Sequence, residues 1–224
     1  MNYQAVIFDF DYTLGDATDA IYAGFRHAFS SMGLPVPERE AVRRTVGLPV
    51  QEAYSLLTGD RDQTRRETFY SLFHPVARDM QAKGVVELLP YARELLRGLK
   101  EAGVPAALVS TKNTDSLRAV LAVKGVEDCF AYVVGGDRVT RHKPDPEGLL
   151  WVLRRLELPP ESALYCGDTV IDAQTAASAG TAFCAVLNGT TPAEAFQDLP
   201  HVHIAPDLAD LGRYLGLPAG GGSK

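Results

Sequence analysis

Five short runs of mainly apolar residues lie along the chain, and in each of them the apolar positions are consecutive rather than alternating. Consecutive apolar positions are typical of parallel strands, because both faces of a parallel sheet are buried. The pattern therefore predicts strands at residues 5–10, 106–110, 131–134, 163–166 and 182–187.

The stretches that separate the later strands have the period of amphipathic helices. In residues 91–101, for example, Leu95, Leu96 and Leu99 share one helical face. The same periodicity predicts helices at residues 116–124, 147–156 and 171–179. Strands that alternate with helices indicate an α/β fold with a doubly wound, mainly parallel, Rossmann-like sheet.

The segment from residue 16 to residue 83 departs from this alternation, because its apolar residues keep a helical period and form no strand-like run. We predict a small helical domain at residues 16–83, inserted after the first strand. The core domain then comprises residues 1–15 and 84–218. Residues 219–224, rich in glycine and serine, are expected to form a flexible tail.

Acidic residues outnumber basic residues by 28 to 22, which gives a formal net charge of −6. This balance provides no basic footprint for nucleic acid, and no apolar run approaches the roughly 20 residues that a membrane helix needs. We expect no secretory leader before the first strand, and the cysteines, Cys129, Cys166 and Cys184, lack the spacing of a zinc site. We expect a cytoplasmic protein that binds a small molecule and neither nucleic acid nor membrane; composition carries no signal for an oligomeric state.

Pairs of aspartates follow the first and the fourth predicted strands. Asp9 and Asp11 are two positions apart, so both carboxylates project to the same side of an extended backbone. Asp168 and Asp172 follow the fourth strand, and ligands of open α/β sheets bind beyond the carboxyl ends of the strands. The structural alternative is that the first pair forms a turn, while Asp168 caps a helix that has Asp172 in its first turn.

Four carboxylates at one edge of a sheet would repel each other unless a cation joined them. Mg²⁺ prefers such hard oxygen ligands together with phosphate oxygens of a substrate. The metal and Lys143, in the loop after the third strand, would screen the charge of a phosphate from an attacking carboxylate. The pattern therefore predicts a Mg²⁺ cofactor and a small phosphorylated substrate.

A carboxylate that attacks a phosphate forms an aspartyl-phosphate, which divides one difficult displacement into two easier ones. Asp9 fits this role, and Asp11 would protonate the leaving alkoxide and then activate water. Ser110 and Thr111 would bind the phosphoryl oxygens through a hydroxyl and a backbone amide, unless they only cap the helix that follows. Lys143 precedes Pro144, which keeps the backbone extended and sets where the lysine emerges.

At these positions the sequence resembles the haloacid dehalogenase-like hydrolase superfamily, over residues 3–215. Its four motifs are matched in order by residues 9–14, Ser110, residues 143–146 and residues 167–172. The resemblance implies that Asp9, the main-chain carbonyl of Asp11, and Asp168 hold Mg²⁺, with Asp172 in or just behind that set. It also implies that the helical domain is a cap that closes over the substrate and excludes water.

Individual residues discriminate among the activities of the superfamily. Asp11 argues against dehalogenation, because dehalogenases of this family lack the second aspartate. The absence of lysine before Lys83 argues against phosphonate cleavage, which needs a lysine in the cap. Residues 47–53 look more like the cap of phosphoglycolate phosphatases than that of sugar phosphomutases. We expect hydrolysis of a small organic phosphate, phosphoglycolate being the first candidate; an inorganic pyrophosphatase, a sugar phosphomutase and a non-catalytic binding protein are the alternatives.

Tyr12 occupies a position at which the superfamily usually has glycine. Glycine adopts backbone conformations that cost other residues about 1 kcal/mol or more, so Tyr12 must find an allowed conformation or accept strain. Its ring either packs under the cap or shapes the space for the substrate. Arg43 and Arg44 of the cap are candidate anion contacts, although arginines on a helix surface are usually solvated.

Overall fold

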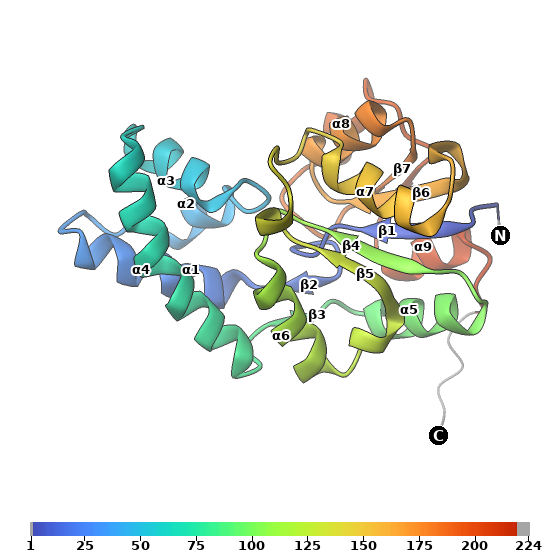
Figure 1. Cartoon of the computed structure of the whole chain (residues 1–224), viewed down its shortest axis with the longest axis horizontal. Helices are drawn as coiled ribbons and strands as arrows, with labels where there is room; N and C mark the ends of the chain where they lie inside the picture. The colour runs from blue at the N-terminus through green and yellow to red at the C-terminus, as the bar shows by residue number, and fades with distance from the viewer. Residues whose placement is uncertain (1, 219–224) are drawn as a thin grey trace.

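The central sheet has six parallel strands in the order β5-β4-β1-β6-β7-β8 (Figure 1). The structure is a computed structural model that describes residues 2–218. The strands are β1 (Ala5–Phe8), β4 (Ala106–Val109), β5 (Phe130–Val134), β6 (Ala163–Gly167), β7 (Ala182–Val186) and β8 (His203–Ala205). The predicted fold class, a doubly wound and mainly parallel α/β sheet, is confirmed.

Two details of the sheet differ from the sequence prediction. β1 ends at Phe8, two residues earlier than expected, because the chain leaves the sheet and enters the loop that carries Asp9 and Asp11. β8 was not expected, because it has three residues, of which only Ala205 is fully buried. A strand this short at the edge of a sheet leaves no apolar run in the sequence.

Helices cover both faces of the sheet, which explains why its strands are apolar at consecutive positions. They are α5 (Ala92–Glu101), α6 (Thr114–Lys124), α7 (Glu147–Leu156), α8 (Val170–Ala179) and α9 (Leu208–Tyr214). Val6 and Phe8 of β1 pack in the apolar cluster formed with α5, α6 and α9. Ala5 and Ile7 enter the cluster formed with α7 and α8 on the opposite face. Alternate residues of one strand therefore stabilise two separate halves of the core.

Four helices follow β1 and β2 in the chain and form a group beside the sheet (Figure 1). They are α1 (Thr18–Ser31), α2 (Arg39–Arg43), α3 (Val50–Thr58) and α4 (Gln63–Ala82), and we call them the helical insertion. Its apolar cluster is built on aromatic rings, with Phe69 stacked on Tyr54 and edge-on to Phe25. At its root, β2 (Gly15–Asp16) pairs antiparallel with β3 (Glu87–Leu88), so the chain leaves and returns at one place.

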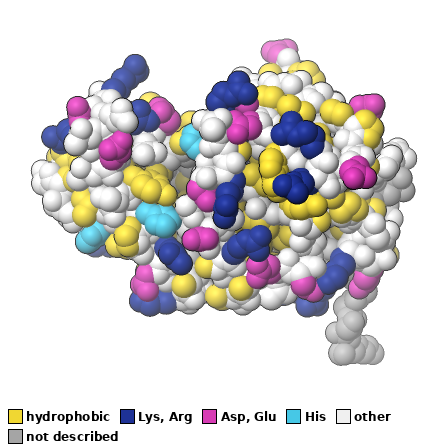
Figure 2. Space-filling view, in the orientation of Figure 1, with side chains coloured by type: hydrophobic (Ala, Val, Ile, Leu, Met, Phe, Trp, Pro, Cys, Tyr) yellow, Lys and Arg dark blue, Asp and Glu magenta, His cyan; other side chains and the backbone are white. Residues whose placement is uncertain are grey.

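The predicted domain boundaries, between residues 15 and 16 and between residues 83 and 84, stay predictions, and the predicted tail at 219–224 lies outside the described residues. Within residues 2–218, no helix combines the length and the apolar character that a membrane crossing requires. Figure 2 shows acidic and basic side chains interspersed over one face of the molecule. A cytoplasmic location stays a prediction.

Candidate active site

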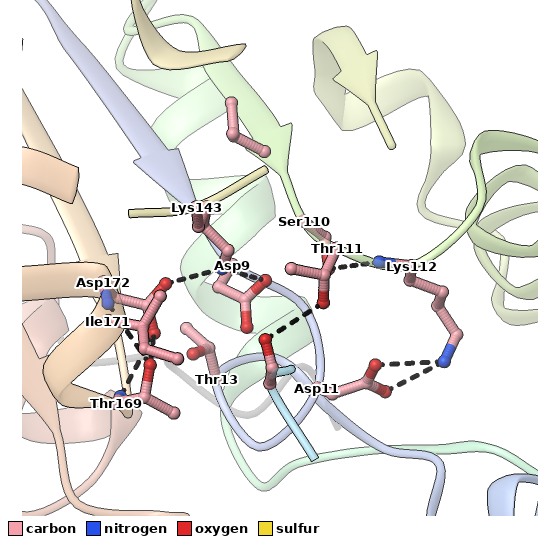
Figure 3. Close-up of polar contacts among 12 residues, drawn as sticks. Asp9, Asp11, Thr13, Ser110, Thr111, Lys112, Lys143, Thr169, Ile171 and Asp172 are labelled. Carbon is pink, nitrogen blue, oxygen red and sulfur yellow. Dashed lines mark hydrogen bonds and ion pairs between the residues drawn. The ribbon is translucent and has the colours of Figure 1, made fainter. Parts of the chain in front are cut away.

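The order of the strands places three of the predicted site segments side by side. β1 lies between β4 and β6, with Phe8 in register with Leu108 on one side and Cys166 on the other. The residues that follow these strands therefore meet at the carboxyl edge of the sheet, as Figure 3 shows for Asp9, Ser110 and Thr111. This is also the point at which the strand order reverses, where ligands bind in sheets of this kind.

Asp9 lies directly after β1 and is only 2% exposed. Its Oδ1 lies 3.0 Å from the Nζ of Lys143, but the geometry of this ion pair is not that of a hydrogen bond, so the oxygen has no hydrogen-bond partner among residues 2–218. Burial raises the pKa of Asp9 to about 6, since it outweighs the opposing charge of Lys143. An acceptor with an unused lone pair therefore faces the site.

Lys143 reaches the site from the loop after β5 and joins Asp9 to a second carboxylate. Its Nζ lies 2.6 Å from Asp172 Oδ1 and 3.3 Å from the hydroxyl of Tyr165. Burial disfavours the charged ammonium, yet the nearby carboxylates of Asp172 and Asp9 raise the pKa of Lys143 well above its usual value. The lysine is thus held as a cation at the centre of the site.

Tyr165 was missed by the sequence prediction, which treated residues 163–166 as an apolar strand. Its hydroxyl lies 3.0 Å from both Asp172 Oδ1 and the carbonyl oxygen of Val109 and has one proton to donate to either. Burial, followed by the charge of Asp172, raises the pKa of Tyr165 well above its usual value, which keeps the phenol protonated. The available signal, which the sequence analysis did not use, was a lone side chain with a polar group within an apolar strand.

Asp172 also closes the amino end of α8. Its Oδ2 accepts hydrogen bonds from the backbone N–H and the hydroxyl of Thr169, and the Thr169 Oγ1 accepts one from the backbone N–H of Asp172. These hydrogen bonds form a capping box. The residue that caps α8 is Thr169, and not Asp168, as the alternative interpretation of the sequence had it. Asp172 therefore has both roles that the sequence left open: its Oδ2 belongs to the helix cap, and its Oδ1 contacts Lys143 in the site.

Asp168 is 3% exposed and is held by two residues that the sequence analysis did not select. The hydroxyl of Thr13 donates to its Oδ1 over 3.3 Å. Gly189 packs so closely that an added Cβ would lie 2.0 Å from Asp168 Oδ2. Burial, with the charges of Asp172 and Asp9 adding to it, raises the pKa of Asp168 well above its usual value.

The carboxylates of Asp9, Asp168 and Asp172 offer oxygens that all lie within 4.8 Å of one another. Of the lysines and arginines in the described chain, Lys143 is the one that pairs with this group. Three acids against one ammonium leave an excess of negative charge in a buried place, and hard oxygen donors suit a divalent cation such as Mg²⁺. The donor set therefore fits the predicted metal.

The side chain of Asp11 points away from Asp9 and Asp172, as Figure 3 shows. Its two oxygens lie 3.1 and 3.0 Å from the Nζ of Lys112. Both side chains are almost fully buried, at 10% exposure for Asp11 and 7% for Lys112. The sequence analysis gave Lys112 no role, and its place directly after Ser110 and Thr111 was the available signal.

Ser110 and Thr111 do not cap the helix that follows them, because Asn113 caps α6 and accepts a hydrogen bond from the backbone N–H of Asp115. Ser110 is 6% exposed, and its Oγ accepts a hydrogen bond from the backbone N–H of Lys112 over 3.4 Å. The Thr111 hydroxyl donates to the carbonyl oxygen of Gly47 in the helical insertion, 3.2 Å away. The second predicted motif therefore lies between the sheet and the insertion.

A model of the haloacid dehalogenase-like hydrolase family matches residues 6–186 of the chain, which include all these site residues except Gly189. The chain belongs to the haloacid dehalogenase-like hydrolases.

Relatives of this hydrolase support a narrower statement. The protein named "Probable phosphatase IndB" from Dickeya dadantii (strain 3937) is 33% identical over 188 residues, which cover 82% of this chain and 81% of the relative. A phosphoglycolate phosphatase of Escherichia coli (strain K12) is 29% identical over 238 aligned positions, covering 96% and 93% of the two chains. A structure from Bacteroides fragilis, described as a haloacid dehalogenase-like hydrolase, superposes with a TM-score of 0.88 at 37% identity, covering 93% of this chain and 99% of its own. The hydrolase is a phosphatase.

Tyr12 of the phosphatase has a positive φ of 56°, in the left-handed region that glycine usually occupies. The side chain is 4% exposed, its hydroxyl is hydrogen-bonded to Thr18, and the guanidinium of Arg43 lies 5.4 Å from the centre of its ring. Arg44 instead points outward, with its side chain 73% exposed and its Nε 3.3 Å from Glu40. Of the two predicted arginines, the structure brings only Arg43 to the loop of Asp9 and Asp11.

A cavity of about 270 Å³ separates the helical insertion of the phosphatase from its sheet. Asp11, Thr111 and Lys112 line it from the sheet side, and residues 45–51 line it from the insertion. The far wall is one face of α4 that includes Phe73. The cavity therefore lies beside Asp11 and extends under the insertion.

Proposed function

We propose that the phosphatase hydrolyses phosphomonoesters through Asp9 as the nucleophile. The observation that carries this proposal is the buried Asp9 Oδ1, which lies 3.0 Å from the ammonium of Lys143 and has no hydrogen-bond partner in the part of the chain that the structure describes. In the first step this carboxylate attacks phosphorus, and the bond from phosphorus to the substrate alcohol breaks. In the second step water attacks the same phosphorus, which releases phosphate and regenerates the Asp9 carboxylate.

Asp11 is the proposed acid and base of the two steps. It protonates the departing alkoxide and then removes a proton from the attacking water. In this structure both its oxygens contact Lys112, so the side chain has to exchange that ammonium for the leaving-group oxygen. Asp11 and Lys112 both line the cavity, which is the place where a leaving group would lie.

The proposed cofactor is Mg²⁺, which supplies electrostatic screening of the phosphate when it is bound. Asp9 and Asp168 would hold it, together with the main-chain carbonyl of Asp11. Asp172 belongs behind them, since its Oδ1 contacts Lys143 and its Oδ2 accepts two hydrogen bonds from Thr169. Its part in the proposal is to orient Lys143.

The phosphoryl oxygens would be bound by Ser110, Thr111 and Lys143. Ser110 is buried at the end of β4, and Lys143 Nζ contacts the proposed nucleophile directly. The helical insertion would act as the cap that excludes water, because Thr111 and Tyr12 both contact it. Exclusion of water strengthens the attraction between Lys143 and the phosphoryl group.

The proposed substrate is a small organic phosphate, with phosphoglycolate as the first candidate. Support comes from the similarity to the Escherichia coli phosphoglycolate phosphatase over nearly the whole chain. Pyrophosphate hydrolysis and sugar phosphate mutation share the same nucleophile and are the competing activities. A non-catalytic protein would bind phosphate without turning it over.

The test is release of phosphate from phosphoglycolate, pyrophosphate and sugar phosphates, with Mg²⁺ or with EDTA. We expect turnover only with the metal, and near-complete loss in Asp9→Asn. Asp128→Asn is the matched control, because that aspartate is exposed and paired with Lys100 on the surface. Near-full activity of Asp9→Asn would refute the nucleophile, and no turnover of any compound by the wild type would favour the binding protein.

A further inference from the structure

One face of α4 lines the cavity and carries polar side chains between apolar ones. Its residues are Tyr70, Phe73, His74, Ala77 and Gln81, at the spacing that places side chains on one side of a helix. The same helix contributes Phe69 to the aromatic core of the insertion. Phe73 and Ala77 belong both to this core and to the cavity wall, whereas Tyr70, His74 and Gln81 lie outside the buried core and face the cavity.

Two polar atoms on this face have no hydrogen-bond partner within the described chain. They are the Oε1 of Gln81 and the Nε2 of His74, and Gln81 is only 3% exposed. A buried acceptor without a partner is costly, so such groups usually have a ligand or water to satisfy them. The Gln81 oxygen requires a donor, which a hydroxyl group on a bound molecule would supply.

The charges around the cavity oppose a second anionic group on the substrate. Among the described lining residues, Lys112 is the only lysine or arginine, and its ammonium is already paired with Asp11. Asp137 adds a carboxylate to the lining; its Oδ1 accepts a hydrogen bond from the backbone N–H of Thr114 over 2.6 Å, and its Oδ2 lies 3.4 Å from the Nε of Arg138. A carboxylate that entered this space would find no unpaired lysine or arginine among the described lining residues and would lose its hydration.

We infer that the leaving group of the substrate is a neutral, hydroxylated alcohol, such as a polyol or sugar, whose hydroxyl donates to Gln81. This inference rests on the proposed function and refines it, because it places carboxylate-bearing esters such as phosphoglycolate second. The bond from phosphorus to this alcohol breaks, the phosphoryl group passes to Asp9, and Asp11 supplies the proton that makes the alcohol. Phe73 and Ala77 face the carbon chain between the hydroxyl groups, and Gln81 determines the specificity.

Two esters of equal length test the inference, because glycerol 3-phosphate and 3-phosphoglycerate differ only in a terminal hydroxymethyl or carboxylate group. We expect the wild type with Mg²⁺ to favour glycerol 3-phosphate by at least about tenfold in kcat/KM. In Gln81→Leu that preference should fall about 3- to 10-fold, the effect of one lost neutral hydrogen bond. Gln63→Leu is the matched control, since Gln63 is exposed at the other end of α4, and it should keep the wild-type ratio.

The outcomes separate this inference from the function on which it rests. Acetyl phosphate, whose leaving group is small, reports the phosphoryl-transfer chemistry of the wild type. If it is hydrolysed while the wild type prefers 3-phosphoglycerate, the inference is overturned and the phosphatase mechanism stands. A folded Gln81→Leu variant with the wild-type ratio of kcat/KM for the two esters would also overturn the inference. If that variant does not fold, the ratio measured for the wild type decides the question. If acetyl phosphate, an acyl phosphate, and the phosphate esters all remain intact, the proposed function fails and the inference falls with it.

Discussion

The Nζ of Lys143 lies 2.6 Å from Oδ1 of Asp172, and the exposed fractions of the two side chains are 5% and 0%. The second oxygen of Asp172 closes the capping box of α8 with Thr169. One carboxylate therefore fixes the lysine of the site to the beginning of a helix. A lysine has many rotamers, so this anchor limits where its ammonium can lie.

Asp172→Asn should lower kcat/KM about 10- to 100-fold, the usual effect of removing a partner that orients a functional group. The Mg²⁺-dependent assay of phosphate release measures it. Thr169→Ala is the control, because it removes the cap hydroxyl and leaves the charge of Asp172 in place. That variant should lose about 1 kcal/mol of unfolding free energy and stay within about threefold of wild-type activity. Equal losses of activity in both variants would assign Asp172 to the cap alone.

Gly189→Ala should lower both the affinity for Mg²⁺ and the phosphatase activity by about tenfold or more. A Cβ at this position would lie 2.0 Å from Asp168 Oδ2, so the carboxylate would have to move. Magnesium titration of activity measures the change. Gly98→Ala serves as the control, because its Cβ would meet Leu217 at an ordinary 3.5 Å, and alanine in a helix is favoured by up to about 1 kcal/mol. Wild-type affinity for Mg²⁺ in Gly189→Ala would contradict the role of Asp168.

Tyr12 is expected to stabilise the fold through its buried ring in spite of its left-handed backbone. Glycine would relieve about 1 kcal/mol of backbone strain and forfeit about 3 kcal/mol of ring packing, so Tyr12→Gly should lower the unfolding free energy by about 2 kcal/mol. Tyr12→Phe should lose about 1 kcal/mol with the hydrogen bond to Thr18 and keep the substrate preference. Urea denaturation and a substrate panel provide the measurements. A changed preference in Tyr12→Phe would instead show that its hydroxyl shapes the substrate site.

The stability of the metal-free protein should fall as pH rises from 5 to 7. Burial raises the pKa of Asp9 from 3.8 to about 6, so the folded state holds this proton more tightly than the unfolded state. The contribution is fully present below the unfolded pKa and is lost as pH rises through the folded pKa. Melting temperatures in EDTA measure the trend, and Asp9→Asn should show a smaller fall. An equal fall in that variant would exclude Asp9 as its source.

Magnesium should offset this loss at pH 7, because the cation binds the ionised carboxylates of the folded state. At ten times its Kd, a ligand that binds only the folded state adds about 1.4 kcal/mol of stability. The rise in melting temperature on adding Mg²⁺ is the measurement. Asp168→Asn should reduce it strongly, and Asp128→Asn, on the surface, should not. If Mg²⁺ raised the melting temperature of Asp168→Asn as much as that of the wild type, Asp168 would not be a ligand of the metal.

Local patterns in the chain were enough to predict strands β1, β4, β5, β6 and β7 of the sheet, the helices between them and the helical run at residues 16–83, but not β8. Consecutive apolar positions mark strands buried on both faces, and a helical period marks residues 16–83, because both signals depend on neighbours within a few positions. The place of Asp9 and Asp168 follows from chain order alone, since parallel strands end at one edge. The family assignment needed only these residues and their spacing.

Contacts between distant segments were decided by the tertiary structure. Asp11 meets Lys112, 101 positions along the chain, because β1 and β4 are neighbours in the sheet and the loops after them approach each other. Gly189 touches Asp168 because β6 and β7 lie side by side. That the polar face of α4 lines a cavity opposite the sheet is visible only in the tertiary structure. Sequence determined which acids reach the strand ends, whereas packing of separate segments decided which partner each acid faces, since that depends on loop paths and side-chain directions that short-range patterns do not encode.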